Sequence, residues 1–207
     1  MKKTILITGG AGFIGSNFVY HILDNTNYDI INFDALTYAG NLNNLKKIAG
    51  NFRYKFIKGD ITNLDDLLQL KKEKFEFIIN FAAESHVDRS IDSPNQFSIT
   101  NILGTQNMLN LALEKNIEKF VQISTDEVYG SLGKTGYFTE TTPLDPTSPY
   151  SASKTSADLI AFSYHKTFGI PLNITRCSNN YGPFQFPEKL IPLMINNALK
   201  QIELPVY

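Results

Sequence analysis

Two adjacent acidic residues in this sequence are well suited to proton transfer. Asp126 and Glu127 directly follow an apolar run that begins at Phe120. A strand that enters a core ordinarily ends in turn residues such as Gly, Pro or Asn, so a carboxyl pair at this place calls for another explanation. Two carboxyl groups with different pKa values can divide the removal of one proton and the donation of another.

Tyr150 and Lys154 form a second candidate group. They are four residues apart, which places both side chains on one face of a helix. A nearby ammonium favours the phenolate and so lowers the pKa of a tyrosine, which makes it a usable base for a sugar hydroxyl. The same pair also occurs by chance on many helices, so its meaning depends on the motifs around it.

A glycine-rich turn follows the first apolar run. Residues 8–16 read TGGAGFIGS, and glycines at 10, 12 and 15 fit the GxGxxG dinucleotide fingerprint. Glycine is needed there because a side chain would keep the backbone away from a pyrophosphate bound at the helix N-terminus. A tight turn without a ligand is the alternative for a lone match.

Asp34 lies 19 residues after Gly15, where an acid binds the ribose 2′-hydroxyl of a dinucleotide. A carboxylate would repel a 2′-phosphate, so this position favours NAD over NADP. Asp60 follows the third expected strand. It would either accept a hydrogen bond from the adenine amino group or cap a helix, and the sequence leaves both open.

The elements that must position these residues alternate between strands and helices. Strands are expected at 4–8, 29–34, 53–58, 75–82, 119–124 and 171–176, and helices after the glycine turn and at 41–48, 63–71, 94–115 and 148–168. This alternation predicts an α/β fold, a Rossmann-like doubly wound parallel sheet with helices on both faces. The irregular stretch 130–149 is interpreted as a loop over a site.

Composition excludes several classes of partner. The 207 residues carry a formal net charge of -1, which provides no field for nucleic acid or anionic lipid. No apolar run approaches the roughly 20 residues of a membrane helix. One cysteine, Cys177, excludes an internal disulfide, and three histidines without Cys pairs give no metal-ligand spacing. We therefore expect a cytoplasmic protein with no metal, nucleic acid or membrane partner.

Several motifs together resemble a known family. With the glycine fingerprint, and with Ser124 and Thr125 after the fifth expected strand, the Tyr150/Lys154 pair resembles the extended short-chain dehydrogenase/reductase superfamily. Within it, residues 34–41 (DALTYAGN), 82–90 (AAESHVDRS), 124–130 (STDEVYG) and 176–183 (RCSNNYGP) closely resemble the dTDP-glucose 4,6-dehydratase family. A dehydratase needs an acid pair after the Ser-Thr, whereas an ordinary sugar epimerase does not, which would explain Asp126 and Glu127.

The resemblance implies a bound NAD and a reaction path. Tyr150, assisted by Lys154 and Thr125, would deprotonate the glucose 4-hydroxyl while hydride passes from C4 to NAD. Glu127 would then take the C5 proton, Asp126 would protonate the departing 6-hydroxyl, and NADH would return hydride to C6, giving dTDP-4-keto-6-deoxyglucose for deoxysugar or rhamnose synthesis. Because the cofactor ends as it began, it should stay tightly held.

The resemblance also implies the residues that contact each ligand. Those expected to bind the cofactor are Gly9, Gly12, Phe13, Ile14, Gly15, Asp34, Leu36, Thr37, Gly40, Asp60, Ile61, Phe81, Ala82, Ala83, Ser85, Thr100, Ser124, Tyr150, Lys154, Cys177 and Asn180. Those expected to bind the substrate are Ser85, His86, Thr125, Asp126, Glu127, Asn179, Lys189, Leu190, Pro205 and Tyr207. An ordinary loop histidine remains the alternative for His86.

The resemblance further predicts the organisation of the chain. Residues 1–187 are expected to form the NAD-binding domain with the catalytic residues, and residues 188–207 the start of a C-terminal substrate domain that is largely absent, with reduced activity. In the superfamily two long helices pair as a four-helix bundle, so we expect a homodimer through 94–115 and 148–168. The apolar residues behind this expectation are Phe97, Ile102, Leu109, Leu159, Ile160 and Phe162.

Two other functions stay open at this point. One is an NDP-sugar 4-epimerase or decarboxylase of the same superfamily, which has no use for Asp126 and Glu127. The other is a non-catalytic NAD-binding interaction module, against which the joint presence of Tyr150, Lys154 and the acid pair counts. The nucleotide is open as well, because dTDP-, CDP- and GDP-sugar dehydratases share this chemistry; the stretch at 34–41 favours dTDP.

Overall fold

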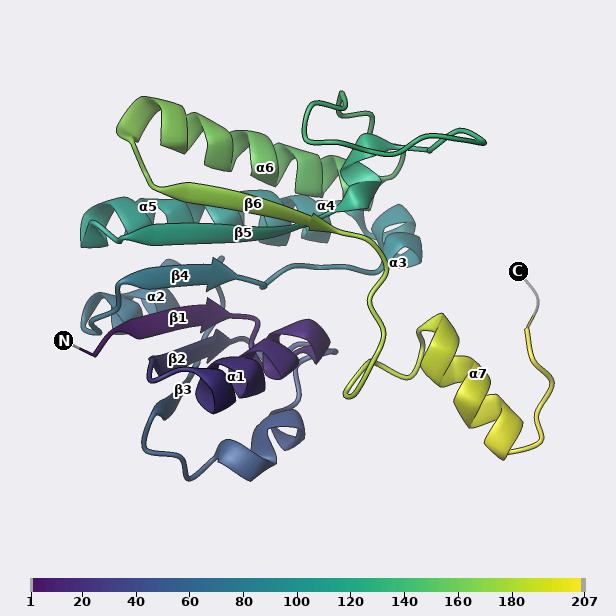
Figure 1. Ribbon diagram of the computed structural model, residues 1–207, viewed down its shortest axis with the longest axis horizontal. Helices are drawn as coiled ribbons and strands as arrows, with labels where there is room; N and C mark the ends of the chain where they lie inside the picture. The colour runs from purple at the N-terminus through teal and green to yellow at the C-terminus, as the bar shows by residue number, and fades with distance from the viewer. Residues whose placement is uncertain (1, 206–207) are drawn as a thin grey trace.

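The central element is a six-stranded sheet in which all neighbouring strands are parallel (Figure 1). The computed structural model describes residues 2–205. The strands run in the order β3-β2-β1-β4-β5-β6, and their bounds are β1 (Thr4–Thr8), β2 (Asp29–Asp34), β3 (Tyr54–Lys58), β4 (Phe77–Asn80), β5 (Lys119–Thr125) and β6 (Leu172–Cys177). The predicted Rossmann-like sheet is therefore confirmed.

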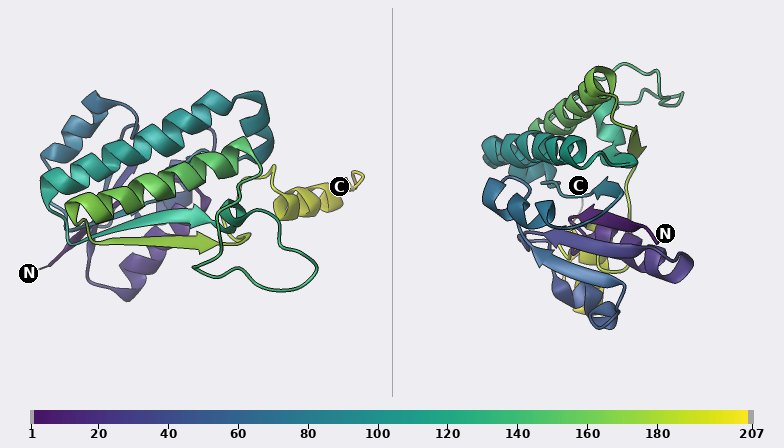
Figure 2. Two further views of the ribbon diagram at one scale, coloured as in Figure 1. Left: turned by 90° about the horizontal axis from the view of Figure 1, so that it is seen from above. Right: turned by 90° about the vertical axis from the view of Figure 1, so that its left-hand side faces the viewer.

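Helices cover both faces of this sheet (Figure 2). Helix α1 (Phe13–Asn25) and the 3-10 helix η1 (Leu42–Ile48) pack on one face, where Val19 and Leu45 join Ile5 and Ile7 in one core. The other face carries α2 (Leu64–Lys71), α5 (Thr105–Lys115) and α6 (Pro149–Phe168). Successive β1 side chains alternate between the two cores, as a strand buried on both faces requires.

The predicted helix at 94–115 is continuous but not uniform. It comprises α4 (Pro94–Phe97), a π-helical segment η2 (Ser98–Gly104) and α5, and it follows the short helix α3 (Val87–Asp92). A Cβ on Gly104 would lie 2.5 Å from Ile61 Cδ1, so a larger residue here would require the Ile61 side chain to shift. π-helical segments occur frequently at functional sites, and this one faces the pocket through Thr100.

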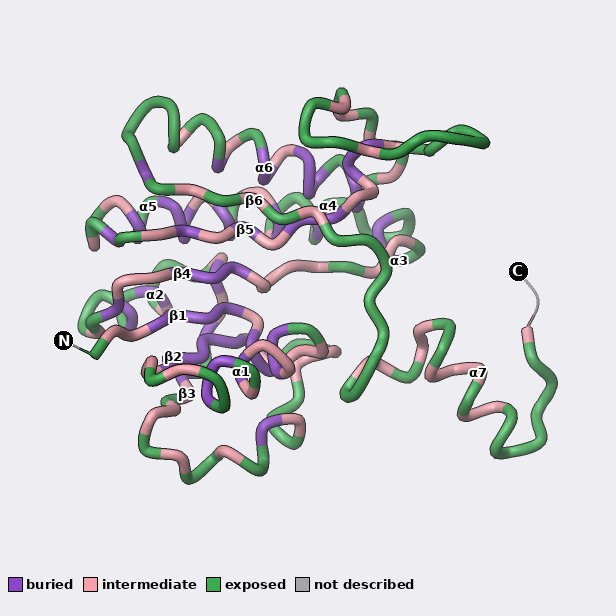
Figure 3. The backbone as a smooth tube through the Cα atoms, viewed as in Figure 1, coloured by how far each residue is buried: buried purple, intermediate pink, exposed green. Residues whose placement is uncertain are grey.

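Two segments beyond the sheet are more exposed (Figure 3). The short 3-10 helix η3 (Asp126–Tyr129) leads into the predicted loop, whose residues 131–137 are all exposed. Helix α7 (Leu190–Leu199) stands beyond the carboxyl ends of the strands and has no buried residue (Figure 1). The sequence pattern predicted no helix at α7, only the start of another domain there.

Candidate active site

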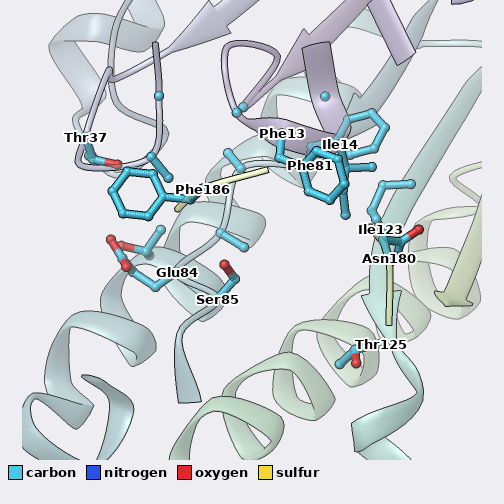
Figure 4. A pocket seen from close by; sticks show the side chains of 18 of the residues that line it. Phe13, Ile14, Thr37, Phe81, Glu84, Ser85, Ile123, Thr125, Asn180 and Phe186 are labelled. Atoms are coloured by element: carbon cyan, nitrogen blue, oxygen red, sulfur yellow. The ribbon is translucent and has the colours of Figure 1, made fainter. Parts of the chain in front are cut away.

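A cavity of about 540 Å³ lies at the carboxyl ends of β1, β2, β4 and β5. The strand order reverses between β1 and β4, and ligands of open α/β sheets bind at such a point. Figure 4 shows Thr37, Glu84, Ser85 and Phe186 toward one side of the cavity and Ile123, Thr125 and Asn180 toward the other. Its size is within the range of ligand pockets, about 300–1,000 Å³.

The glycine turn forms one wall of the cavity. Gly9 has φ 68°, and a Cβ there would lie 2.7 Å from the backbone nitrogen of Ala82, so no other residue fits. A Cβ on Gly15 would collide with the carbonyl oxygen of Gly9. Gly12 is the N-cap of α1, with no side-chain cap and no acidic residue in the first turn. The free N–H groups of this turn fit an anionic diphosphate.

Asp34 is held rigidly at the end of β2. Its Oδ2 accepts from the Ala11 N–H at 2.9 Å and its Oδ1 from the Leu36 N–H at 2.8 Å. Burial raises the pKa of this carboxyl, and the two N–H donors oppose the rise. The carboxylate borders the cavity beside the glycine turn, which is compatible with a ribose diol.

Asp60 also lines the cavity, but it does not cap a helix. Its Oδ1 accepts from both the N–H and the hydroxyl of Thr62 at 2.8 Å, which closes a local turn. Asn63 is the N-cap of α2 and accepts from the N–H groups of Asp65 and Asp66. The helix-capping alternative for Asp60 is therefore wrong.

Tyr150 lies in the first turn of α6 and is only 8% exposed. Its pKa is raised, first by burial and then by the Glu127 charge, while the Thr125 hydroxyl lowers it. The expectation that Lys154 lowers this pKa is not met in the protein alone, because the Lys154 ammonium donates to the carbonyl oxygen of Ile123 at 2.6 Å.

Glu127 is the half-buried member of the acid pair. Burial raises its pKa, the neighbouring Asp126 adds to the rise, and Lys189 opposes it. A raised pKa makes a carboxylate a stronger base near neutral pH. Thr125, the N-cap of η3, accepts from the Glu127 N–H at 3.2 Å and donates to Asp126 at 3.3 Å, so one threonine orients both acids.

Lys154 lies beside a buried ionic cluster formed by Asp158 and Arg176. Burial lowers the pKa of this lysine, and Asp158, four residues further along α6, opposes the shift. Asp158 is 1% exposed and accepts from Ser124 Oγ at 2.9 Å and Arg176 Nε at 3.1 Å. The cluster thereby ties α6 to the ends of β5 and β6. The spacing of four residues between Lys154 and Asp158 is the signal by which the sequence could have indicated Asp158.

A second buried link joins the loop after β4 to α6. Asn101, 1% exposed, accepts from the Glu84 N–H at 2.8 Å and donates to the Glu84 carbonyl at 3.0 Å. It also donates to Ser153 Oγ at 2.8 Å, directly beside Lys154. Sequence reasoning missed Asn101 because its partners are distant in the chain; a polar residue within an apolar helical run was the one available signal.

Most of the predicted site residues line this one cavity. The cofactor candidates that do so are Gly9, Gly12, Phe13, Ile14, Gly15, Asp34, Thr37, Gly40, Asp60, Ile61, Phe81, Ala82, Ala83, Ser85, Thr100, Ser124, Tyr150, Lys154, Cys177 and Asn180. The substrate candidates that do so are Ser85, Thr125, Glu127, Asn179, Lys189 and Leu190. Tyr38, Glu84, Gln185 and Phe186 also line it and were not predicted.

Four predicted residues do not line the cavity. Leu36 packs beside the core under α1, His86 faces Glu188 at 3.4 Å, and Asp126 contacts Thr125. Pro205, near the end of the described chain, is half-buried and also lies off the cavity wall. Tyr207 lies outside the described residues.

The described residues offer neither a membrane-spanning helix nor a metal-binding cluster. No helix within residues 2–205 is long and apolar enough to cross a membrane. Over the same part of the chain, no group of three or more His, Cys, Asp or Glu side chains is arranged to hold a metal ion.

A parallel Rossmann sheet with a glycine turn and a Tyr/Lys helix at its switch point defines a protein of the short-chain dehydrogenase/reductase class. The family described as GDP-mannose 4,6 dehydratase matches residues 6–207, and the chain belongs to it. More particularly, the chain is a homologue of dTDP-glucose 4,6-dehydratases. The enzyme of that name from Xanthomonas campestris pv. campestris is 50% identical over 99% of this chain and 61% of its own length.

Solved structures agree with this assignment. The dTDP-glucose 4,6-dehydratase of Bacillus anthracis, in complex with NAD, superposes with a TM-score of 0.91 and 56% identity over 99% of this chain and 64% of that one. UDP-glucuronic acid 4-epimerase of Bacillus cereus, with UDP-glucuronic acid and NAD, also reaches 0.91 but is 32% identical, over 99% and 65%. The chain thus spans less than two thirds of these relatives.

Proposed function

We propose that this chain catalyses the NAD-dependent dehydration of dTDP-glucose to dTDP-4-keto-6-deoxyglucose. The observation that carries the proposal is the position of the acid pair. Glu127 lines the same cavity as Tyr150, Lys154 and the glycine turn, and Asp126 adjoins it directly after β5. Elimination of water requires a proton acceptor and a proton donor close to the tyrosine that deprotonates the alcohol.

The residues of the cavity fit NAD. The uncapped start of α1 would hold the diphosphate, Asp34 the adenosine ribose, and Tyr150 with Lys154 the nicotinamide end. When bound, NAD supplies the two-electron acceptor for oxidation at C4 and the donor for reduction at C6. Its positive charge would also offset the burial that raises the pKa of Tyr150.

The side chains of this protein then divide the proton transfers. Tyr150 takes the proton of the 4-hydroxyl, with the Thr125 hydroxyl as its hydrogen-bonding neighbour. A ketone at C4 acidifies the C5 hydrogen, and Glu127, whose pKa burial raises, takes that proton. Asp126 protonates the departing 6-hydroxyl. Lys189, which lowers the pKa of Glu127, comes from the segment that follows β6.

Mass spectrometry in D2O would separate this function from 4-epimerisation, the activity in the name of the Bacillus cereus relative. We expect a dTDP-glucose product lighter by one water and carrying one solvent deuteron at C5. An epimerase would return an isomer of unchanged mass without deuterium at C5. CDP-glucose and GDP-mannose in parallel reactions would test the nucleotide. Absence of any dehydrated product from dTDP-glucose would overturn the proposal.

The division of the chain and its assembly are part of the same proposal. Residues 188–207 would begin the substrate-binding part, which the position of Lys189 and Leu190 on the cavity wall supports. A homodimer through α4 to α6 is supported by exposed Leu159 (56%) and Phe162 (49%). Phe97 and Leu109, which were also expected to contribute, are buried within the subunit and cannot.

A further inference from the structure

Arg89 joins two segments that border the cavity without lining the cavity itself. It lies on α3, with its guanidinium 3.9 Å from the centre of the Tyr38 ring. Its Nη2 donates to Glu188 Oε2 at 3.0 Å. Tyr38 belongs to the loop after β2, and Glu188 to the segment between β6 and α7. The Arg89 guanidinium therefore contacts two residues of the cavity wall that are distant from each other in the sequence.

The segment that contains Glu188 forms part of the cavity wall. At one end Asn17 donates to the carbonyl oxygen of Pro183 at 2.9 Å, and Phe184 stacks on Tyr20 at 6.0 Å between centroids, so α1 anchors it. Gln185, Phe186, Glu188 and Lys189 then line the cavity. At the other end Phe186 meets the edge of Tyr38 at 5.5 Å, where Arg89 stacks.

Arg89 is the one side chain among the described residues that contacts Tyr38 by stacking and Glu188 by an ion pair. It also acts on Glu84 of the loop after β4: burial raises the pKa of this carboxyl, and the Arg89 charge opposes the rise. Arg89 thus contacts the segments that follow β2 and β6, and its charge also acts on the loop that follows β4. An arginine suits this place because its planar group stacks on a ring and pairs with a carboxylate at once.

We propose that Arg89 is a positioning residue of the dinucleotide site, which holds the two cavity-lining residues Tyr38 and Glu188 together and thereby slows release of NAD. The inference rests on the proposed function in that it takes NAD as the ligand. It supplies a structural reason for retention of the cofactor between turnovers, because release requires the segment 183–189 to separate from the loop after β2.

The dissociation rate of NAD, measured by stopped-flow displacement, tests this inference. Arg89→Met removes the charge and the stacking plane but keeps the length of the side chain, and we expect release about tenfold faster, the effect of losing one half-exposed ion pair and one cation–π contact. Glu188→Gln should give a smaller acceleration, and the double variant should release NAD no faster than Arg89→Met. Arg89→Lys should recover part of the retention through Glu188.

A matched control is Lys71→Met, which breaks the similarly exposed ion pair between Lys71 and Glu114 outside the cavity and should leave the rate unchanged. Hydrogen exchange without NAD supplies a second readout. The backbone amides of residues 183–189 should exchange faster in Arg89→Met than in wild type, and at the wild-type rate in Lys71→Met. If wild type did not bind NAD, the proposed function would be rejected. The exchange comparison would still test whether Arg89 holds the segment 183–189 in place, because it is made without NAD. Unchanged exchange or an unchanged release rate in Arg89→Met would overturn the inference.

Discussion

Substitution of Gly12 by alanine should weaken NAD binding while leaving the fold intact. Gly12 has φ -75° and ψ 178°, a conformation that alanine adopts without strain. An added Cβ would meet only the Gly9 carbonyl oxygen at 3.4 Å, an ordinary contact. Loss of glycine at an N-cap should cost about 0.5–1 kcal/mol, or about 1–4 °C in melting temperature for a chain of this size.

The effect on the cofactor should be larger. The new methyl group would stand at the start of α1, where the free N–H groups face the cavity. A displaced diphosphate would lose at least one charge-assisted hydrogen bond, worth about 1.5–3 kcal/mol. The dissociation constant of NAD should therefore rise about 10- to 150-fold.

Titration calorimetry and thermal unfolding of three variants separate the two effects. Gly50→Ala is the control, because nothing lies within 4 Å of its added Cβ. Gly15→Ala should destabilise the fold itself, because its Cβ would lie 2.3 Å from the Gly9 carbonyl oxygen. The cost of such overpacking reaches about 3 kcal/mol and exceeds the helix gain of about 1 kcal/mol. An NAD affinity of Gly12→Ala within twofold of wild type would show that the diphosphate does not lie over this turn.

Four further outcomes are expected. In calorimetry, Asp34→Asn should bind NAD more weakly than wild type and NADP more tightly than wild type. An unchanged preference for NAD over NADP would contradict the ribose role of Asp34. Burial raises the pKa of Asp34, so its contribution to stability is complete below the unfolded-state pKa of about 3.9 and is lost as pH rises through the folded-state pKa. In urea titrations, the unfolding free energy of wild type relative to that of Asp34→Asn should therefore decline from pH 4 toward neutral pH. A difference that stays constant over this range would refute the argument. Glu127→Gln should accumulate NADH absorbance with dTDP-glucose but form no 6-deoxy product, whereas a wild-type rate of product formation would exclude Glu127 as the C5 base. Phe162→Glu should shift light-scattering mass from dimer toward monomer at micromolar concentration, and a monomeric wild type would reject the dimer.

Sequence periodicity predicted the elements whose signals are local. The bounds of β1 and β2 match their predicted ranges because β-branched runs there end abruptly in Gly, Ala or Asp. The π-helical segment η2 stayed hidden, since a single wide turn inside an apolar helical run leaves the overall pattern unchanged. Helix α7 was not predicted, and none of its residues is fully buried in the described chain.

The site shows the same division. Motif spacing predicted that the glycine turn, Asp34 and the Tyr150/Lys154 pair would meet, and all of them line one cavity. The electrostatics could not be read from spacing, because burial and Glu127 determine the direction of the Tyr150 pKa shift. The contacts of Asn101 and Arg89 join chain segments that only the folded topology brings together.

The strand order also affects how the chain emerges from a ribosome. β1 pairs with β2 on one side, but on its other side it pairs with β4, whose first residue comes 69 positions after the end of β1. At a synthesis rate of roughly 5–20 residues per second, that edge of β1 waits about 3–14 s for its partner. Its open backbone groups and the buried residues Ile5, Leu6 and Ile7 remain available to other nascent chains for that time. Synonymous codons that slow translation between β3 and β4 should therefore lower the soluble yield more than equal slowing after β5.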